Sequence, residues 1–192
     1  MLVAIDEVGR GALAGPVTIG AVAIDARCGE APEGVRDSKA LSEARRLALA
    51  GPIRTWAREA VVVHVPAARI DEVGITFALG QGAAQSVSLI QSLIQETSAV
   101  GTVLLDGRHD FLTPVDDRWT VHTVVRGDAT CASIAAASII AKCERDQLMR
   151  NLHARYPDYG WDSNVGYGTA VHRAAIGAHG LTPEHRASWN LR

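Results

Sequence analysis

The chain has 192 residues, of which 47% are hydrophobic and 21% charged, a composition that supports one globular domain and excludes a disordered chain. Its formal net charge of −2 excludes a protein that holds nucleic acid by overall charge, so a site for a polyanion must be a local patch.

The cysteines and the apolar stretches bear on the compartment. Cys28, Cys131 and Cys143 are odd in number and lack metal-ligand spacing, so we expect them to be reduced. The start of the chain lacks the charged region of a signal peptide, and the apolar stretch around residues 131–141 is too short to span a membrane. These patterns predict a cytoplasmic protein with no membrane contact.

The first half of the chain alternates strands and helices. Apolar runs bounded by turn residues predict three strands, over 2–5, 17–25 and 60–66. Residues 41–53 predict a helix that begins after the cap Ser42 and ends at the pair Gly51-Pro52. Residues 67–98 predict two helices that are broken near Gly74.

The second half predicts two more strands, over 101–107 and 119–125. A long helix is expected over 130–156, where small residues allow close packing on a sheet, and another helix around 168–179. Two consecutive strands at the start favour a hairpin, and the later alternation favours parallel strands with crossover helices. The order therefore predicts an α/β domain with a mixed sheet.

Four acids stand where predicted strands end or a helix begins. Asp6 and Glu7 follow the first strand, Asp106 ends the fourth, and Asp128 lies between the fifth strand and the long helix. Buried carboxylates are unfavourable unless a cation or a basic partner compensates them. Converging carboxylate oxygens are the ligands that Mg²⁺ prefers, so a metal site is one interpretation and four separate surface groups are the other.

Asp146 is excluded from this set by its position on the long helix. It lies 18 residues beyond Asp128, which at the rise of a helix is about 27 Å. It stands four residues from both Lys142 and Arg150, so an ion pair on the helix face accounts for it.

The glycines after the first strand do not match a dinucleotide-binding loop. Their positions, Gly9, Gly11 and Gly15, differ from that motif, and the adjacent acids would repel a pyrophosphate. Gly9 and Gly11 could let the backbone approach a ligand closely, with Arg10 reaching a phosphate or sugar. A plain tight turn is the alternative.

Two other stretches carry possible contacts to nucleic acid. Residues 36–46, together with Arg54, concentrate cations suited to phosphate contacts, although a solvated loop and helix face is the simpler interpretation. In the tail, Tyr167 stands between two glycines and could stack on a sugar or base, or could be packed. Further donors in the tail are His172, Arg173, His185 and Arg186.

Five motifs in order identify a resemblance across nearly the whole chain. The stretches "DEVGRG", "DSK", "LLDG", "GDATCASIAAASIIAKCERD" and "GYGTAVH" resemble ribonuclease HII, the type 2 ribonuclease H. The resemblance implies a ribonuclease H-like mixed five-stranded sheet flanked by helices. Residues 1–155 would form the catalytic domain, and residues 156–192 a small helical extension of it that recognises substrate.

The activity that the resemblance implies is endonucleolytic. The enzyme would cleave the RNA strand of RNA–DNA hybrids and nick duplex DNA on the 5′ side of a single embedded ribonucleotide, as in ribonucleotide excision repair. Products would carry 3′-hydroxyl and 5′-phosphate ends. Cleavage would need Mg²⁺ or Mn²⁺, with two ions per active site, and the protein would act on these duplexes as a monomer.

The resemblance also assigns roles to residues by their place in the motifs. Four acids would bind the metal ions and carry catalysis: Asp6, Glu7, Asp106 and Asp128. Five residues would contact substrate: Gly9, Arg10 and Gly11 at the 2′-hydroxyl, Tyr167 on the neighbouring deoxyribose, and Lys39 at backbone phosphates. A binding module with an inactive site, and a metal nuclease acting on plain DNA or Holliday junctions, are the alternatives.

Overall fold

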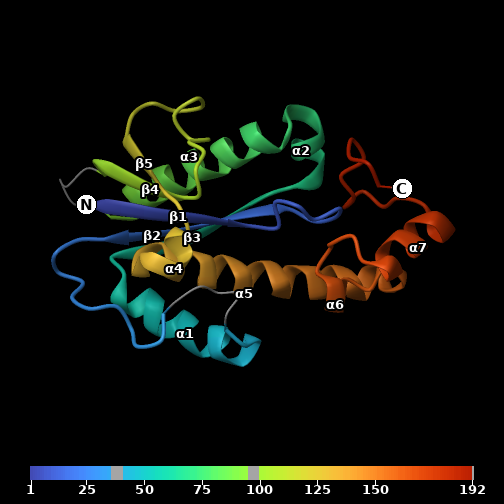
Figure 1. Cartoon of the computed structure of the whole chain (residues 1–192), viewed down its shortest axis with the longest axis horizontal. Helices are drawn as coiled ribbons and strands as arrows, with labels where there is room; N and C mark the ends of the chain where they lie inside the picture. The colour runs from blue at the N-terminus through green and yellow to red at the C-terminus, as the bar shows by residue number, and fades with distance from the viewer. Residues whose placement is uncertain (36–40, 95–99, 192) are drawn as a thin grey trace.

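Five strands form one mixed sheet at the centre of the computed structural model, which describes residues 1–35, 41–94 and 100–191 (Figure 1). In chain order the strands are β1 (Leu2–Val8), β2 (Val17–Ile24), β3 (Glu59–Val65), β4 (Thr102–Asp106) and β5 (Thr120–Val124). Their order across the sheet is β3-β2-β1-β4-β5. The predicted α/β class and the mixed five-stranded sheet are therefore confirmed.

The direction of the strands decides which residues meet at one edge. β1 and β2 pair antiparallel as the predicted hairpin, whereas β1–β4 and β4–β5 are parallel. Parallel strands end at the same side of a sheet. The carboxyl ends of β1, β4 and β5 are consequently neighbours.

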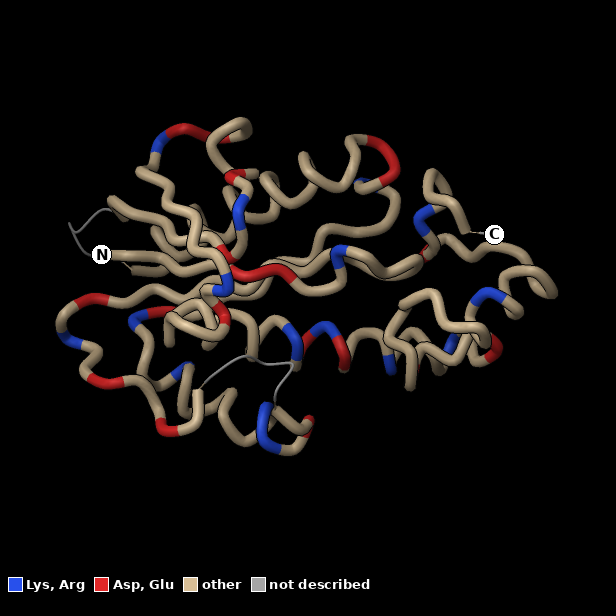
Figure 2. The backbone as a smooth tube through the Cα atoms, in the orientation of Figure 1, with Lys and Arg blue, Asp and Glu red and all other residues tan. Residues whose placement is uncertain are grey.

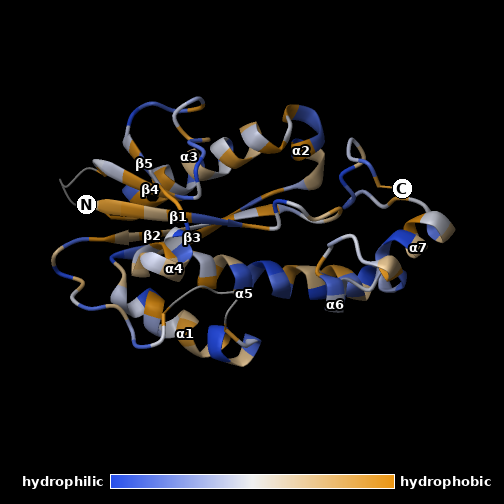
Figure 3. Ribbon diagram, viewed as in Figure 1, coloured by the Kyte–Doolittle hydropathy of each residue, from blue (hydrophilic) through white to orange (hydrophobic). Residues whose placement is uncertain are grey.

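Helices cover both faces of this sheet. They are α1 (Glu43–Trp56), α2 (Ala67–Val73), α3 (Ile75–Leu93), α4 (Gly127–Thr130), α5 (Ala132–Arg155), α6 (Trp161–Asn164) and α7 (Ala170–His179), with a 3₁₀ turn at Pro157–Tyr159. Helix α3 packs on one face, and α5, supported by α1, packs on the other (Figure 1). Apolar colour is concentrated on the strands between these two layers (Figure 3).

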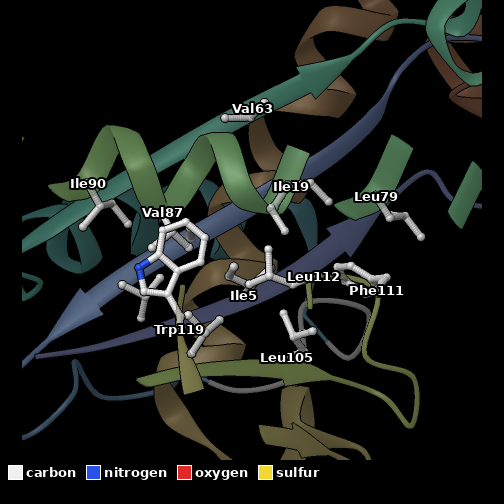
Figure 4. Packing of buried hydrophobic residues seen from close by; sticks show 14 of the residues in the cluster. Ile5, Ile19, Val63, Leu79, Val87, Ile90, Leu105, Phe111, Leu112 and Trp119 are labelled. Carbon is white, nitrogen blue, oxygen red and sulfur yellow. The ribbon is translucent and has the colours of Figure 1, made fainter. Parts of the chain in front are cut away.

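The core is divided between the two faces of the sheet. On the α3 side, Ile5, Ile19 and Leu105 of the strands pack with Val87 and with Trp119 (Figure 4). On the α5 side, buried aliphatic residues of α1, β2 and α5 form a second cluster. Because both faces of the sheet are covered, the central strands β1 and β2 are almost continuously apolar, as their sequences indicate.

Two helix boundaries differ from prediction. Helix α1 begins after the cap Ser42, as expected, but the predicted stop at Gly51-Pro52 is wrong because the helix runs on to Trp56. Leu49 and Ile53 lie one turn apart and are both buried, so packing on either side of the proline holds the helix together. The long helix begins at 132 rather than 130, since α4 forms a separate turn before it. The predicted break at Gly74 is confirmed.

Within the described ranges, no single helix is long and apolar enough to cross a membrane. The bent pair α2 and α3 meets the requirement only by combined length and composition. Ala78, Leu79 and Val87 of α3 are fully buried against the sheet, as in the core helix of a globular domain.

The close approach of β2 to α5 requires a glycine. A Cβ on Gly20 would lie 2.2 Å from the carbonyl oxygen of Ala137. We predict that Gly20→Ala lowers the free energy of unfolding by about 1–3 kcal/mol, because strand and helix must separate to admit the methyl group.

Urea denaturation measures this change, and Gly177→Ala is the matched control. Gly177 lies in α7, with no atom within 4 Å of the added methyl group, so its replacement is expected to be neutral or slightly stabilising. Equal effects at the two positions would contradict the packing argument.

Candidate active site

Four acids lie at or near the carboxyl ends of the parallel strands β1, β4 and β5, and Figure 2 shows acidic segments of the backbone around the centre of the molecule. Asp6 and Glu7 lie near the end of β1, Asp106 is the last residue of β4, and Asp128 lies in α4 just after β5. Asp6 is 4% exposed and Asp128 8%. The backbone N–H of Asp128 donates to Oδ1 of Asp106 at 3.3 Å, so the last of the four is joined to the sheet edge.

The charges at this edge oppose one another. Burial raises the pKa of Asp6 to about 7, and the negative charges of Glu7 and Asp106 add to the shift, against a hydrogen bond from Ser138. Burial, with the charge of Asp106, also raises the pKa of Glu7, and Arg10 at 3.4 Å opposes this. The protein thus brings carboxylates together without enough positive charge to balance them.

The donor set fits a hard divalent cation. Every candidate ligand is a carboxylate, and oxygen donors of this kind suit Mg²⁺ and Mn²⁺. In the described part of the chain, no three His, Cys, Asp or Glu side chains already form a metal-binding group. Oxygens of Asp6 and Asp106 accept backbone N–H bonds, and Glu7 accepts a hydrogen bond from Arg10.

A cleft of about 360 Å³ opens beside β1. Its lining residues are Asp6, Glu7, Val8, Gly9, Arg10, Gly11, Ser138, Lys142 and Tyr167. Two of the four acids thus share one cleft with Tyr167, which is distant in sequence. Asp128 lines a separate hollow of about 220 Å³ beside α4, and Lys39 lies outside the described residues.

The cleft floor is the loop that joins β1 to β2, residues 9–16, which we call the glycine loop. Gly9 and Gly15 have φ values of +84° and +79°, which favour glycine. A Cβ on Gly9 would lie 2.1 Å from Nε of Arg145, so the missing side chain leaves room for Arg145, while Gly9 itself also lines the cleft. The space beside Gly11 is open, with no atom within 4 Å.

Two fully buried arginines hold the glycine loop by its carbonyl groups. Arg186 donates to the carbonyl oxygens of Gly9 and Arg10, both at 2.7 Å, and to that of Gly15 at 3.1 Å. Arg145 donates to the carbonyl oxygen of Pro16 at 3.0 Å. Arg186 was expected to offer donors to a ligand, and this is wrong because its guanidinium is used inside the protein.

Helix α5 lines the cleft beside the glycine loop. Ser138, Lys142, Arg145 and Met149 are spaced by four, three and four residues, so they form one stripe on the helix. Ser138 meets Asp6, Lys142 lines the cleft, and Arg145 and Met149 lie under the loop. Sequence analysis missed Arg145. The spacing could have indicated the stripe, but only the fold shows that it faces β1.

Two cations of the predicted phosphate patch, and the acid Asp146, form ion pairs within the protein. Asp146 binds Lys142 at 2.7 Å, as expected, whereas the other predicted partner, Arg150, pairs with Glu43. From the basic stretch, Arg46 lies 3.8 Å from Asp146. Arg54, the cation beyond it, pairs with Glu144. The proposed phosphate patch is therefore partly neutralised within the described residues, and Arg36 lies outside them.

The tail residues divide between the interior and the cleft. His172 and His185 are buried beside Trp161, so they do not offer donors to a ligand, whereas Tyr167 is 38% exposed. The guanidinium carbon of Arg145 lies 5.7 Å from the centre of the Tyr167 ring. The arginine beneath the glycine loop therefore also supports the aromatic wall of the cleft.

Comparison with known proteins places this geometry in a family. The family model described as Ribonuclease HII matches residues 3–192. The ribonuclease HII of Streptomyces avermitilis is 42% identical over 189 residues, covering 98% of this chain and 76% of that protein.

Solved structures show the same fold. The chain matches a structure of the PCNA:RNase HII complex from Archaeoglobus fulgidus with a TM-score of 0.75 and 27% identity, covering 100% of this chain and 97% of that one. It also matches Bst-RNase HIII, solved in complex with Mn²⁺, with a TM-score of 0.75 and 19% identity, covering 99% of this chain and 67% of that one. The chain belongs to the ribonuclease HII family of metal-dependent endoribonucleases, which cleave RNA in RNA–DNA hybrids and at embedded ribonucleotides.

Proposed function

We propose that Asp6, Glu7, Asp106 and Asp128 are the catalytic acids of this ribonuclease HII and together hold two Mg²⁺ or Mn²⁺ ions. The observation that carries the proposal is the sheet topology, in which the parallel strands β1, β4 and β5 bring these acids to one edge, and the pKa of buried Asp6, raised to about 7, supports it. Carboxylates gathered in this way, one of them with a perturbed pKa, are characteristic of a functional site. The hydrogen bond from the backbone N–H of Asp128 to Asp106 supports the inclusion of Asp128, which lies in α4, among the catalytic acids.

The acids would act by holding divalent cations next to the phosphodiester bond that is cleaved. Divalent ions in such a site supply an activated water and stabilise the leaving oxygen. Asp6 is oriented for ligand binding by the Glu7 N–H at 2.8 Å and by Ser138. We propose cleavage on the 5′ side of a ribonucleotide, leaving 3′-hydroxyl and 5′-phosphate ends, and the order of motifs that resembles ribonuclease HII supports this polarity.

We assign recognition of the ribonucleotide to the glycine loop and Tyr167, which line the same cleft as α5. The 2′-hydroxyl distinguishes RNA from DNA at a given position. Gly11 is the place where the backbone is open to a sugar, and Arg10 is exposed beside it. Tyr167 would stack on the neighbouring deoxyribose, and Lys39 remains a proposed phosphate contact. We propose that the protein acts on hybrid and ribonucleotide-containing duplexes as a monomer.

The first test replaces the acid that joins α4 to the sheet edge. We predict that Asp106→Asn lowers the rate of cleavage at a single embedded ribonucleotide by about 10³-fold or more, because the site loses charge needed to bind cations. Affinity for the duplex should change far less. Single-turnover cleavage with Mg²⁺, mapped to the nucleotide, measures the rate.

Asp117→Asn is the matched control for this substitution. Asp117 is exposed and precedes β5, so it lies at the other end of that strand from the site. This variant should cleave at the wild-type rate. Normal nicking by Asp106→Asn would remove Asp106 from the catalytic set.

The second test separates recognition from chemistry. Tyr167→Ala should slow cleavage at a single ribonucleotide about tenfold more than cleavage of a long RNA–DNA hybrid, because stacking on one sugar or base contributes about 1–3 kcal/mol. Parallel kinetics on the two substrates give the ratio. Tyr167→Phe keeps the ring and should keep the ratio. Equal slowing on both substrates would exclude the recognition role.

A further inference from the structure

Two buried histidines have no place in the chemistry just described. His172, on α7, and His185, near the end of the chain, lie beside Trp161 with almost no exposed surface. Their Nε2 atoms are 3.1 Å apart. Two basic groups in contact inside a protein require a definite arrangement of protons, and the neighbouring groups determine that arrangement.

The proton on His185 is fixed by a backbone donor. The N–H of Thr182 can only donate, and it lies 2.9 Å from Nδ1 of His185. Nδ1 must therefore be an acceptor, and in the neutral ring the proton is on Nε2. His185 consequently donates from Nε2 to its neighbour, His172.

The proton on His172 is fixed by an independent donor. The indole N–H of Trp161 also can only donate, and it lies 3.1 Å from Nε2 of His172. The single lone pair of that nitrogen is shared by the donors Trp161 and His185, so the proton of His172 is on Nδ1. Nδ1 lies 3.0 Å from the carbonyl oxygen of Tyr167, which can only accept.

The chain of bonds is complete with both rings neutral. It runs from the Thr182 N–H through His185 and His172 to the Tyr167 carbonyl, and each donor faces an acceptor. Burial lowers the pKa of His172, and burial together with the neighbouring His172 lowers the pKa of His185 to about 4. Both shifts favour the neutral rings that this arrangement requires.

The chain of bonds ends on a residue that borders the active-site cleft. The Tyr167 carbonyl also accepts from the Thr169 N–H at 2.8 Å, and the Tyr167 N–H donates to the carbonyl of Asn164 at 2.9 Å. The next residue toward the amino end, Gly166, accepts at its carbonyl from Leu13 of the glycine loop at 2.8 Å. The backbone of Tyr167 is thus held between the glycine loop and the histidine pair.

We propose that His172 and His185 form a hydrogen-bond relay with one fixed proton order that positions Tyr167 in the substrate cleft. His172 is a positioning residue that acts through the Tyr167 backbone and does not contact substrate. The inference rests on the proposed role of Tyr167 in recognising the sugar beside the ribonucleotide. It extends that role to a buried pair of residues beyond the cleft.

Two substitutions of His172 separate its two bonds. His172→Gln places an amide near the position of Nε2, so Trp161 keeps a partner while the Tyr167 carbonyl loses its donor. His172→Asn places an amide N–H near the position of Nδ1 and keeps that donor. The measured quantity is the ratio of kcat/KM for a single embedded ribonucleotide to kcat/KM for a long hybrid.

We expect His172→Gln to lower this ratio about tenfold, as for Tyr167→Ala, and His172→Asn to keep it within about twofold of wild type. The double variant Tyr167→Ala/His172→Gln should fall no further than Tyr167→Ala alone, because both changes remove one function. Additive losses, or a wild-type ratio in His172→Gln, would overturn the positioning role.

A spectroscopic measurement tests the relay without using activity. In the wild-type protein with ¹⁵N-labelled histidine, long-range ¹H–¹⁵N correlation should show His172 with its proton on Nδ1 and His185 with its proton on Nε2 at pH 7. The opposite tautomers, or a charged ring, would overturn the relay even if the variants failed to fold.

The two proposals fail in different ways. If Tyr167→Ala leaves the ratio unchanged while the spectrum shows the expected tautomers, the recognition role of Tyr167 is excluded, and with it the positioning role of His172, although the relay itself stands. If Tyr167→Ala lowers the ratio while His172→Gln does not, Tyr167 keeps its role and the positioning by His172 is excluded.

Discussion

Carboxylates crowded at a poorly solvated sheet edge are the constraint on which the rest of this structure depends. Three parallel strands end together, and their order brings Asp6 of β1, Asp106 of β4 and the segment after β5 to one place. Water is largely excluded from Asp6, and its neighbours carry the same sign of charge. Such an arrangement is unfavourable for the ionised acids unless cations enter, as the proposed metal site requires.

Positive charge near this edge is used to shape the backbone more than to neutralise the acids. The guanidinium groups of Arg145 and Arg186 are fully buried, and they donate to carbonyl oxygens of the glycine loop and its surroundings. Burial, with repulsion from Arg145, lowers the pKa of Arg186 to about 10, so Arg186 stays charged at neutral pH. Because Gly9 leaves room for Arg145, this α5 side chain packs directly against the loop, and it also binds the carbonyl oxygen of Val165 in the tail.

Much of the fold and part of the site could be predicted from the sequence. Apolar periodicity located the five strands, but β1 runs to Val8, so Asp6 and Glu7 lie inside the strand and do not follow it as predicted. The end of α1 was missed because packing of Leu49 and Ile53 outweighed the local signal of Pro52. The roles of Arg145 and Arg186 could not be predicted, since a buried arginine binding distant carbonyls leaves no local pattern. Such bonds join residues about 130 and 170 positions apart.

The central claim is that the acids of this site oppose folding until a cation binds, and the pH dependence of stability tests it most directly. The folded protein keeps the Asp6 proton up to about pH 7, whereas the unfolded chain loses it near the ordinary pKa of 3.8, so metal-free stability falls as the pH rises between these values. The measurement is urea denaturation of wild type and Asp6→Asn in EDTA. The stability advantage of Asp6→Asn should grow by about 3 kcal/mol between pH 5 and pH 8. Mg²⁺ should then stabilise the wild type and not the variant at pH 8. A difference between the two proteins that is independent of pH, or that shrinks as the pH rises, would contradict the account.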